Sequence, residues 1–244
     1  SGKVGAQTLT LSGTGTVVSA NVGNDKAVTL GTLAIADGTN GGLAANYTLV
    51  EAGSIADITT KVISIDGTRV YDGTANVSNS IFTLSGMVGA QTLTLSGTGT
   101  VASANVGNDK AVTTGTLALG DGTNGGLASN YTLAGGTNLA DITAKSVTLD
   151  GTRAYNASAD VANSIFNIVG LVGTQTLVLS GTGTVVSANV GNDKAVTLGT
   201  LAIADGTNGG LAANYTLPQA GSVADITTKV ISIDGTRVYD GTAN

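Results

Sequence analysis

Three residue types are missing from the 244-residue sequence: cysteine, histidine and tryptophan. Without cysteine the chain can form neither a disulfide nor a thiolate metal site. Without histidine it lacks the side chain that most often acts as a general base near neutral pH. No glycine-rich phosphate-binding motif precedes a helical segment. We therefore expect that the protein is not an enzyme and holds no cofactor other than calcium, with paired carboxylates as the one catalytic arrangement left open.

Charged and aromatic residues are also scarce, at 11% and 3% of the chain, and the net charge is −6. Nucleic-acid binding depends on Lys and Arg that neutralise phosphates, and the sequence contains no basic patch. No run approaches the ~18 consecutive apolar residues of a membrane-spanning helix. These features predict no nucleic-acid partner and no membrane insertion. Polarity comes from Thr, Ser, Asn and Gly, as in β-rich extracellular proteins, which predicts a secreted protein.

The chain repeats itself every 84 residues without an insertion. Three sets of residues recur at this interval: Tyr47, Tyr131 and Tyr215; Asp57, Asp141 and Asp225; Lys26, Lys110 and Lys194. Such self-similarity is the signature of a tandem array of structural units. The boundaries predicted are residues 1–60 as the C-terminal part of one copy, 61–144 and 145–228 as complete copies, and 229–244 as the start of another. The sequence is interpreted as a piece of a longer array.

The hydrophobic pattern within each copy is that of short strands. In TLTLSGTGTV, residues 8–17, leucines alternate with threonines, and this period of two predicts a half-buried strand with Leu9 and Leu11 facing the core. In AVTLGTLAIA, residues 27–36, the pattern changes phase at Gly31, which predicts a β-bulge or a bend. About seven strands per copy, roughly 8 to 12 residues apart, predict an all-β fold of tandem antiparallel β-sandwich (Ig-like) repeats in an elongated rod. A parallel β-helix is disfavoured because no sub-period of about 20 to 30 residues occurs.

A tyrosine motif, ISIDGTRVYDGT, occurs at residues 63–74 and 231–242, and the altered form VTLDGTRAYNAS occurs at 147–158. We interpret it as the joint between copies: its second Asp-Gly pair forms a turn, its tyrosine buries a ring, and its arginine pairs with the aspartate three residues before it. The alternative is a tyrosine platform for sugars. The junction residues predicted are Asp66, Arg69, Tyr71, Asp72, Asp150, Arg153, Tyr155, Asn156, Asp234, Arg237, Tyr239 and Asp240. A second tyrosine set, Tyr47, Tyr131 and Tyr215, is expected to lock a loop to a strand.

Two further elements recur in step with this motif: GLAANYTL at residues 42–49 and ADITTKVISIDG at 56–67. Together the three elements resemble the YDG repeat of very large bacterial surface proteins, including filamentous haemagglutinin-like exoproteins and related adhesins. The resemblance covers essentially the whole chain and implies a secreted, cell-surface location and a role as stalk or adhesive repeat, with no catalytic residues. The middle copy departs from the pattern, since Asn156 stands where the others have Asp72 and Asp240. That departure argues against any function that needs this carboxylate in every copy.

Two kinds of chemistry are alternatives to solvated loops at other positions. Asp-Gly pairs in Asn- and Gly-rich loops are weak calcium candidates, because hard cations prefer several oxygen ligands and each loop offers one carboxylate. The residues are Asp37, Asp121 and Asp205, with Asp25, Asp109 and Asp193 as further ligands. Lysines in predicted strands are candidates for isopeptide crosslinks to Asn: Lys61, Lys145 and Lys229, or Lys26, Lys110 and Lys194. Strand-edge lysines, however, commonly prevent edge-to-edge pairing.

The sequence therefore favours a structural or adhesive repeat segment of a large secreted bacterial surface protein, forming an extended stalk or an extracellular matrix fibre. The expected partners are neighbouring repeats of the same chain, other copies of itself in a fibre, and glycans or a host or matrix surface. The alternative function is a repeated glycan-binding module assisted by calcium. An extended particle without a ligand favours the first function, and sugar binding that depends on the motif tyrosines favours the second.

Overall fold

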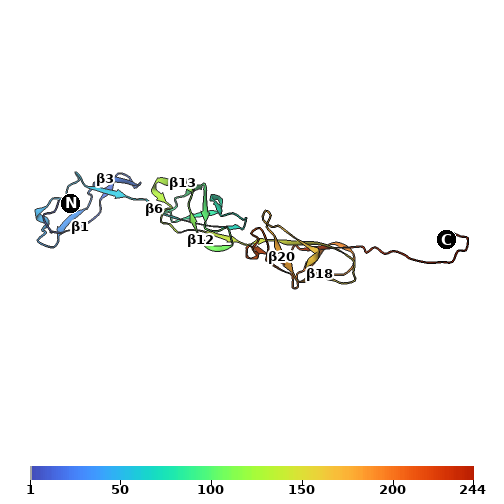
Figure 1. The fold of residues 1–244 in the computed structure, drawn as a ribbon. Coiled ribbons are helices and arrows are strands. Elements are labelled where there is room, and N and C mark those ends of the chain that lie inside the picture. Colours follow the sequence, from blue (N-terminus) through green and yellow to red (C-terminus); the bar gives the residue numbers. More distant parts are fainter. Residues whose placement is uncertain (1) are drawn as a thin grey trace. The chain divides into compact units, whose positions relative to one another are not determined.

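Residues 2–244 are described by a computed structural model, in which they form strands joined by turns and loops (Figure 1). Strands account for 44% of the residues and helix for 6%, so the all-β class predicted from the alternation is confirmed. The helical residues are single 3-10 turns at Ala44–Asn46, Asn79–Ile81, Ala128–Asn130, Asn163–Ile165 and Ala212–Asn214. Among residues 2–244, no helix has the length and apolar character needed to cross a membrane.

Six strands of the copy 145–228 form one curled sheet that resembles half of a barrel (Figure 1). Their order across the sheet is β18-β21-β22-β25-β17-β19. The strands are β17 (Thr148–Ala154), β18 (Asp160–Ala162), β19 (Phe166–Val169), β21 (Thr182–Val185), β22 (Gly191–Thr197) and β25 (Val223–Thr227). Val, Ile and Thr in these segments suit a pleated, half-buried surface. All six strands lie between residues 148 and 227, so this copy supplies every strand of its own sheet.

β17 and β25 are the first and last strands of this sheet in the order of the chain, and they lie side by side and run parallel. Every other pairing in the sheet is antiparallel: β18 with β21, β21 with β22, β22 with β25, and β17 with β19. The sheet is therefore mixed, whereas the strand spacing predicted antiparallel strands throughout. A parallel pair needs a long crossover connection, and here the rest of the copy forms that connection.

The core of the copy 145–228 is built from aliphatic side chains at alternate strand positions. Leu149 on β17 is 1% exposed and Ile226 on β25 is fully buried, which places the centre of the core on the parallel pair. The buried cluster also contains Val161, Val185, Val196, Leu201 and Ala224. β20 (Leu177–Ser180) and β23 (Ala202–Asp205) form a separate antiparallel pair, and Leu179 on β20 packs against this cluster.

The copy 61–144 has the same strand order, β8-β11-β12-β15-β7-β9. Its strands are β7 (Ser64–Val70), β8 (Asn76–Ser78), β9 (Phe82–Ser85), β11 (Thr98–Val101), β12 (Gly107–Thr113) and β15 (Asn138–Thr143). A separate antiparallel pair is formed by β10 (Leu93–Ser96) and β13 (Ala118–Asp121). Residues 2–60 carry a β2-β3-β5 sheet and an antiparallel pair of β1 and β4. Their bounds are β1 (Leu9–Ser12), β2 (Thr16–Val17), β3 (Gly23–Thr29), β4 (Ala34–Asp37) and β5 (Ile55–Ile58). By the repeat, these strands correspond to β20, β21, β22, β23 and β25.

Two short parallel pairs accompany the large sheets. β6 (Lys61–Val62) pairs with β14 (Tyr131–Thr132), and β16 (Lys145–Ser146) pairs with β24 (Tyr215–Thr216). In each pair the lysine lies opposite the tyrosine of the NYTL element. Ala144 alone separates the end of β15 from the start of β16. The connection between the two copies is therefore too short to be a free linker.

The chain divides into two compact units that do not follow the 84-residue repeat. One consists of the residues up to Gly67 together with Val77–Thr100 and Ala111–Leu139. The other, called here the second compact unit, consists of Thr68–Asn76, Val101–Lys110 and Ala140–Asn244. The division passes through the copy 61–144, so the second compact unit contains residues from two successive copies. Its residues 228–244 form no strand and are exposed.

The prediction of a bulge or bend at Gly31 is wrong. The pattern in residues 27–36 arises from two strands: β3 ends at Thr29, and β4 begins at Ala34. Gly31, with a φ of 57°, turns the chain between them, and the Leu33 N–H donates to the Leu30 carbonyl at 2.8 Å. The register shift lies instead within the first residues of β3, between Gly23 and Lys26. A glycine at a phase change marks a break in pairing, but the same pattern is produced by a bulge and by a tight turn.

The prediction that Leu11 faces a core holds in a complete copy and fails in residues 2–60. The equivalent Leu179 packs against the core cluster of the copy 145–228. Leu11 itself is 61% exposed. The reason is that residues 2–60 have no strands equivalent to β17, β18 and β19, which supply the opposing apolar side chains in the complete copy.

Candidate inter-repeat junction

Two tyrosines from successive copies pack together within the second compact unit. Tyr71 directly follows β7, and its N–H donates to the Thr143 carbonyl at 2.8 Å. Tyr215 begins β24. The rings are 3% and 5% exposed, and they meet edge to face with centroids 5.5 Å apart and an interplanar angle of 79°. Such aromatic pairs contribute about 0.5 to 1.5 kcal/mol beyond their area burial.

A glutamine joins the two tyrosine hydroxyls. The Tyr215 hydroxyl donates to Gln175 Oε1 and accepts from the Val172 N–H at 3.1 Å. Gln175 Nε2 in turn donates to the Tyr71 hydroxyl at 2.8 Å. Burial raises the pKa of the Tyr215 hydroxyl, the bond from Val172 lowers it, and the neighbouring Tyr71 adds to the rise. The Tyr215 phenol therefore takes part in the network in its neutral form near neutral pH.

The pair of Tyr215 and Gln175 recurs in the other copies. The Tyr131 hydroxyl donates to Gln91 Oε1, and the Tyr47 hydroxyl donates to Gln7 Oε1 at 2.5 Å. Each hydroxyl also accepts a backbone N–H from the residue 43 positions earlier, Val88 or Val4. The NYTL tyrosine thus ties a loop of its own copy, as the sequence predicted in outline. Tyr71 is added to this arrangement from the preceding copy.

A buried asparagine makes a second contact between successive copies. Asn214 is 1% exposed; its Oδ1 accepts from the Val106 N–H at 2.9 Å, and its Nδ2 donates to Asn105 Oδ1 at 3.0 Å. Asn130 makes the equivalent contacts with Val22 at 2.8 Å and with Asn21 at 2.9 Å. In both cases the asparagine lies 108 residues after the valine. The same polar contact therefore joins each copy to the one before it at two places along the chain.

Replacement of Asn214 by alanine should weaken this contact. The half-buried Val106 N–H would lose its partner, and a donor left unsatisfied away from water costs about 1 to 3 kcal/mol, whereas the exposed Asn105 amide can bind water instead. We expect a loss of about 2 kcal/mol in the free energy of unfolding of Asn214→Ala, measured by urea denaturation.

Asn46→Ala is the matched control for this experiment. Asn46 occupies the same position in its copy and ends the same kind of 3-10 turn, but it is exposed. Its replacement should leave the denaturation midpoint almost unchanged. Equal midpoint shifts for the two variants would contradict the junction contact, because they would show that the loss arises inside each copy.

The turn of the tyrosine motif is formed by Asp72 and Gly73. Asp72 Oδ1 accepts from the Thr74 N–H at 2.8 Å and from the Thr74 hydroxyl at 3.0 Å. Gly73 has a φ of 82°, which favours glycine. A Cβ on Gly73 would lie 2.8 Å from Val172 Cγ1, so the turn also packs against the following copy.

The prediction that Arg69 pairs with Asp66 is wrong. Its guanidinium pairs with Asp72, three residues later, at 2.5 Å and also donates to the Thr74 carbonyl. Asp66 and Arg69 lie three residues apart on β7, and side chains alternate between the two faces of a strand, so these two point to opposite faces. Asp66 lies opposite Thr83 instead. The first Asp-Gly pair of the motif is thus part of a strand, and only the second pair is a turn.

The acid sensitivity of the copy 61–144 should depend on Asp72. Burial raises the pKa of its carboxyl, but hydrogen bonds from the Thr74 N–H and hydroxyl and from Arg69 lower it more, so the pKa lies below its ordinary value. A depressed carboxyl pKa contributes stability above the unfolded-state pKa, and this contribution is lost as the pH falls through the folded value. Asp72→Asn should therefore flatten the decline in stability below about pH 4, measured by urea denaturation between about pH 6 and pH 3.

Asp240→Asn serves as the control for the acid experiment. The pKa of Asp240 is lowered by hydrogen bonds from the Thr242 N–H and hydroxyl, but the residue lies in the exposed segment 228–244. Because this segment forms no strand, replacing the Asp240 carboxyl by an amide should not change the pH profile of unfolding. Parallel profiles for Asp72→Asn and the parent chain would refute the role of Asp72.

The altered motif of the copy 145–228 keeps the turn at the cost of backbone strain. Arg153 donates to Asn156 Oδ1 and to the Ser158 carbonyl, in place of the ion pair of Arg69. Asp150 lies on β17 opposite Asn167 and Val223, away from Arg153. Ala157 has a φ of 67° where the other motifs have glycine. Left-handed backbone disfavours residues with a Cβ.

Ala157→Gly should stabilise the chain by about 1 kcal/mol, because it removes the clash of Cβ in the left-handed conformation. The measurement is the urea midpoint with an unchanged slope. Gly73→Ala is the reverse experiment and should destabilise, since it adds both the strain and the close approach to Val172. A destabilised Ala157→Gly variant would show that flexibility of the unfolded chain outweighs the strain.

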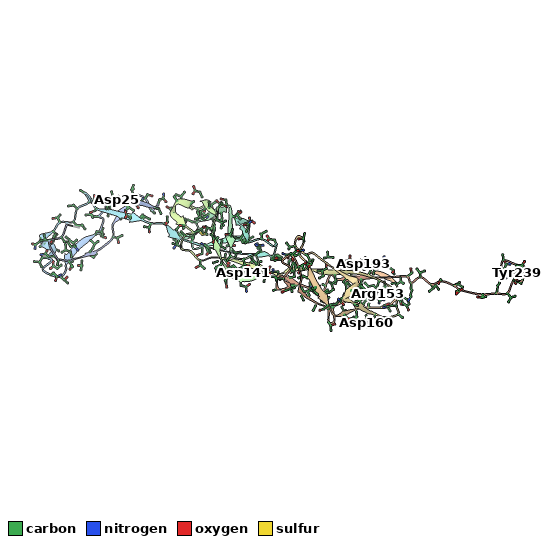
Figure 2. The ribbon with its side chains drawn as sticks, viewed as in Figure 1. Asp25, Asp141, Arg153, Asp160, Asp193 and Tyr239 are labelled. Carbon is green, nitrogen blue, oxygen red and sulfur yellow. The ribbon has the colours of Figure 1, made fainter. Side chains whose placement is uncertain are left out.

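The third motif lies in the exposed segment 228–244. Arg237 pairs with Asp240 at 3.0 Å, so here too the partner is the residue three positions later, and Asp234 is exposed. Figure 2 shows Arg153 within the sheet of its copy and Tyr239 on this segment. Tyr239 is 90% exposed and Tyr155 is 37% exposed. Of the three predicted motif tyrosines, only Tyr71 is packed against a following copy in residues 2–244.

The aspartates proposed as calcium candidates hold their own loops. Oδ1 of Asp37, Asp121 and Asp205 accepts at 2.7 Å from the N–H of Ala44, Ala128 and Ala212, respectively. Asp25, Asp109 and Asp193 have positive φ, and their N–H groups donate to Oδ1 of Asp57, Asp141 and Asp225. Within residues 2–244, no group of three His, Cys, Asp or Glu residues is placed to hold a metal ion.

The lysines considered for crosslinks have other neighbours. Lys61 and Lys145 lie in the short parallel pairs opposite Tyr131 and Tyr215. Lys26 Nζ donates to the Ser19 carbonyl at 3.2 Å. Lys229 belongs to the exposed segment 228–244. The isopeptide hypothesis gains no support from these contacts.

The residues that sequence reasoning missed are Gln175, Asn105 and Asn214. Each recurs at 84 residues: Gln7, Gln91 and Gln175; Asn21, Asn105 and Asn189; Asn46, Asn130 and Asn214. Their period was therefore visible. The sequence does not show that the partner of Asn214 is Val106, 108 residues earlier in the chain. This separation is longer than one 84-residue repeat, so it does not appear as a repeat interval.

Comparison with known proteins agrees with this organisation. A family model described as YDG domain matches residues 56–138 and 138–223. No curated protein and no solved structure matches the chain. The first match contains Tyr71, and the second contains Gln175 and Tyr215, so the tyrosine contact joins consecutive copies of the domain. Since the two matches span more than half of the sequence, the chain belongs to the YDG domain family and carries two tandem copies of that domain.

Proposed function

We propose that this chain is a structural or adhesive repeat segment of a large secreted bacterial surface protein of the filamentous haemagglutinin-like kind, and that its copies form an extended stalk or extracellular matrix fibre. The observation that carries the proposal is the recurring contact between copies. Asn214 binds the Val106 N–H, and Asn130 binds the Val22 N–H, at the same separation of 108 residues. A contact that recurs with the sequence repeat is available to every successive pair of copies.

The path of the chain through one copy supports this proposal. Because β17 and β25 run parallel, the chain enters the sheet at the Thr148 end and leaves it at the Thr227 end. Thr227 lies beside Ala154, the far end of the first strand. Copies joined in this way follow one another head to tail rather than folding back. Small two-layered units in the manner of an Ig-like sandwich, stacked in this sense, would make the proposed rod.

Small-angle X-ray scattering of the purified chain tests the proposal. Two complete copies and one partial copy, each on the order of 30 Å across, should give a maximum dimension on the order of 100 Å. Adding one more copy should lengthen the particle by about 30 Å. A maximum dimension that stays constant when a copy is added would overturn the proposed rod.

Self-association in a fibre is part of the proposal. The surface next to Tyr155 and Asn189 is the counterpart of the one that Tyr71 and Asn105 use toward the following copy, and Tyr155 and Asn189 are both exposed. A second chain offers the complementary groups at its own partial copy, where Asn46 is exposed and Gln7 is half-buried. Concentration-dependent growth of the particle in scattering, absent in Asn189→Ala, is the expected result.

The second candidate function is a repeated glycan-binding module. The observation in its favour is that Tyr155 is 37% exposed, which leaves an aromatic ring available to stack on a sugar. Glycan-array binding that disappears in Tyr155→Ala, and that requires calcium, would support this function. Binding that survives both the substitution and a chelator would assign the sugar site elsewhere.

A further inference from the structure

The parallel pair at the centre of the sheet connects the two points where the chain enters and leaves the copy 145–228. β17 and β25 are in register over five residue pairs, from Asp150 opposite Val223 to Ala154 opposite Thr227. The ladder continues at both ends: the Leu149 N–H donates to Ser222 Oγ at 3.0 Å, and the Tyr155 N–H donates to the Thr227 carbonyl at 2.8 Å. The chain therefore reaches its neighbours through two strands that are bonded directly to each other.

Tension along the chain loads this pair in a particular direction. A pull on the N-terminal side draws Thr148 backward along β17, and a pull on the C-terminal side draws Thr227 forward along β25. Because the strands run the same way, these forces act parallel to the strands and in opposite senses. The hydrogen bonds between them are perpendicular or slanted to the pull, so all of them are strained together. In an antiparallel pair joined by a hairpin, the same pull would open the bonds one after another.

The surroundings of the pair make the bonds hard to replace by water. Leu149, Ala224 and Ile226 are at most 1% exposed and belong to the central core cluster. On its other side β17 is held by β19, with Thr148 opposite Val169 and Gly151 opposite Phe166, and β25 is held by β22. Sliding β17 past β25 would therefore require the core side chains and the flanking ladders to move at the same time.

We propose that the β17–β25 pair is a mechanical clamp that lets each copy resist tension along the chain. The clamp resists force as a unit, and the copy extends only when the whole ladder fails. This inference rests on the sheet of one copy and holds whether the array serves as a stalk or as a glycan-binding module. The proposed property is resistance to a force applied at the two ends of a copy. The equilibrium free energy of unfolding does not measure this resistance.

Single-molecule force spectroscopy of the full chain, tethered at its two termini, tests the clamp. Each complete copy should open in one discrete step at high force. Failure of the clamp should release the residues between β17 and β25, about 80 residues and hence about 260 to 290 Å of extended chain. Gradual extension without a discrete step would overturn the proposal.

A second pulling direction isolates the geometry from the overall stability. The chain has no cysteine, so thiol handles can be placed at two chosen points with Ala154→Cys and Lys229→Cys, both at exposed positions. These handles lie at the same end of β17 and β25 and pull the strands apart sideways, so the ladder opens from that end one bond at a time. We expect the opening force to fall several-fold relative to the pull from the termini.

The handle variant is its own control. It is also pulled from its termini, and that force is the reference, so any loss of stability caused by the cysteines cancels. A sideways force several-fold below the reference supports the clamp. Equal forces in the two directions would show that the parallel pair has no mechanical role and that the core alone sets the resistance.

Discussion

Tyr71→Ala should lower the free energy of unfolding by about 3 kcal/mol, which is the lower end of the range for removing a buried aromatic side chain. The ring is 3% exposed and meets Tyr215 edge to face. Its hydroxyl is the acceptor for Gln175 Nε2, so the substitution also leaves that amide unpaired. Urea denaturation and hydrogen exchange of the residues around Gln175 measure the effect. Because Tyr71 and Gln175 come from different copies, the loss should appear as reduced protection on both sides of the junction.

Tyr155→Ala provides a control from the same chain. Tyr155 occupies the same motif position and its N–H donates to the Thr227 carbonyl, as the Tyr71 N–H does to Thr143. The difference is that no following copy covers its ring within residues 2–244. We expect a shift well below that of Tyr71→Ala. Similar shifts for the two variants would assign the stabilisation to the motif itself and would remove the tyrosine from the junction.

Gly67→Ala should destabilise the chain by about 3 kcal/mol, at the upper end of the range for overpacking. Gly67 lies in β7 opposite Phe82. A Cβ at this position would lie 2.3 Å from the Ile81 carbonyl oxygen and 2.9 Å from Phe82 Cδ1. The carbonyl is backbone and cannot rotate away, so the strands β7 and β9 would have to separate locally. Thermal and urea denaturation should both show the loss.

Gly235→Ala is the matched control, because Gly235 is the glycine of the same DGT triplet in the exposed segment 228–244. A Cβ there would meet nothing within 4 Å. The substitution should leave the midpoint unchanged. A loss at Gly235 as large as the loss at Gly67 would mean that the segment is structured and that its glycine makes contacts like those of Gly67.

The sequence predicted the class and the period of this fold because both are written in local patterns. Alternation of Leu and Thr in residues 8–17 predicted strand structure there, although the single strand expected is two, β1 and β2, separated at Gly13, which has a φ of 87°. The 84-residue interval matches the repetition of the strand order. The turn at Asp72 and Gly73 was predicted for the same reason, since an Asp side chain accepts bonds from nearby backbone N–H groups and Gly readily adopts a positive φ. These features depend on residues within a few positions of each other.

The features that the sequence did not predict depend on partners far along the chain. The β17–β25 pair joins strands from opposite ends of the sequence of a copy. The alternation of apolar and polar residues in these strands does not distinguish parallel from antiparallel pairing. Asn214 shows the same limit, because its buried amide is recognisable only once Asn105 and Val106 are placed beside it. Arg69 is the local exception: the alternation of side chains along β7 excludes Asp66 as a partner, provided the first Asp-Gly pair is assigned to a strand.

The junction joins two unlike surfaces, with Tyr71 and Asn105 on one side and Gln175 and Asn214 on the other. An interface without two-fold symmetry does not close on itself, so a series of such copies has polarity, and nothing in the interface fixes how many copies it contains. Its two outermost faces are chemically different, and each presents groups meant for a neighbour. Solubility of such a series requires terminal capping repeats whose outer face is polar, as in other linear repeat proteins. A terminating copy should therefore carry substitutions at the positions equivalent to Tyr71 or Asn214 while keeping the residues of the sheet.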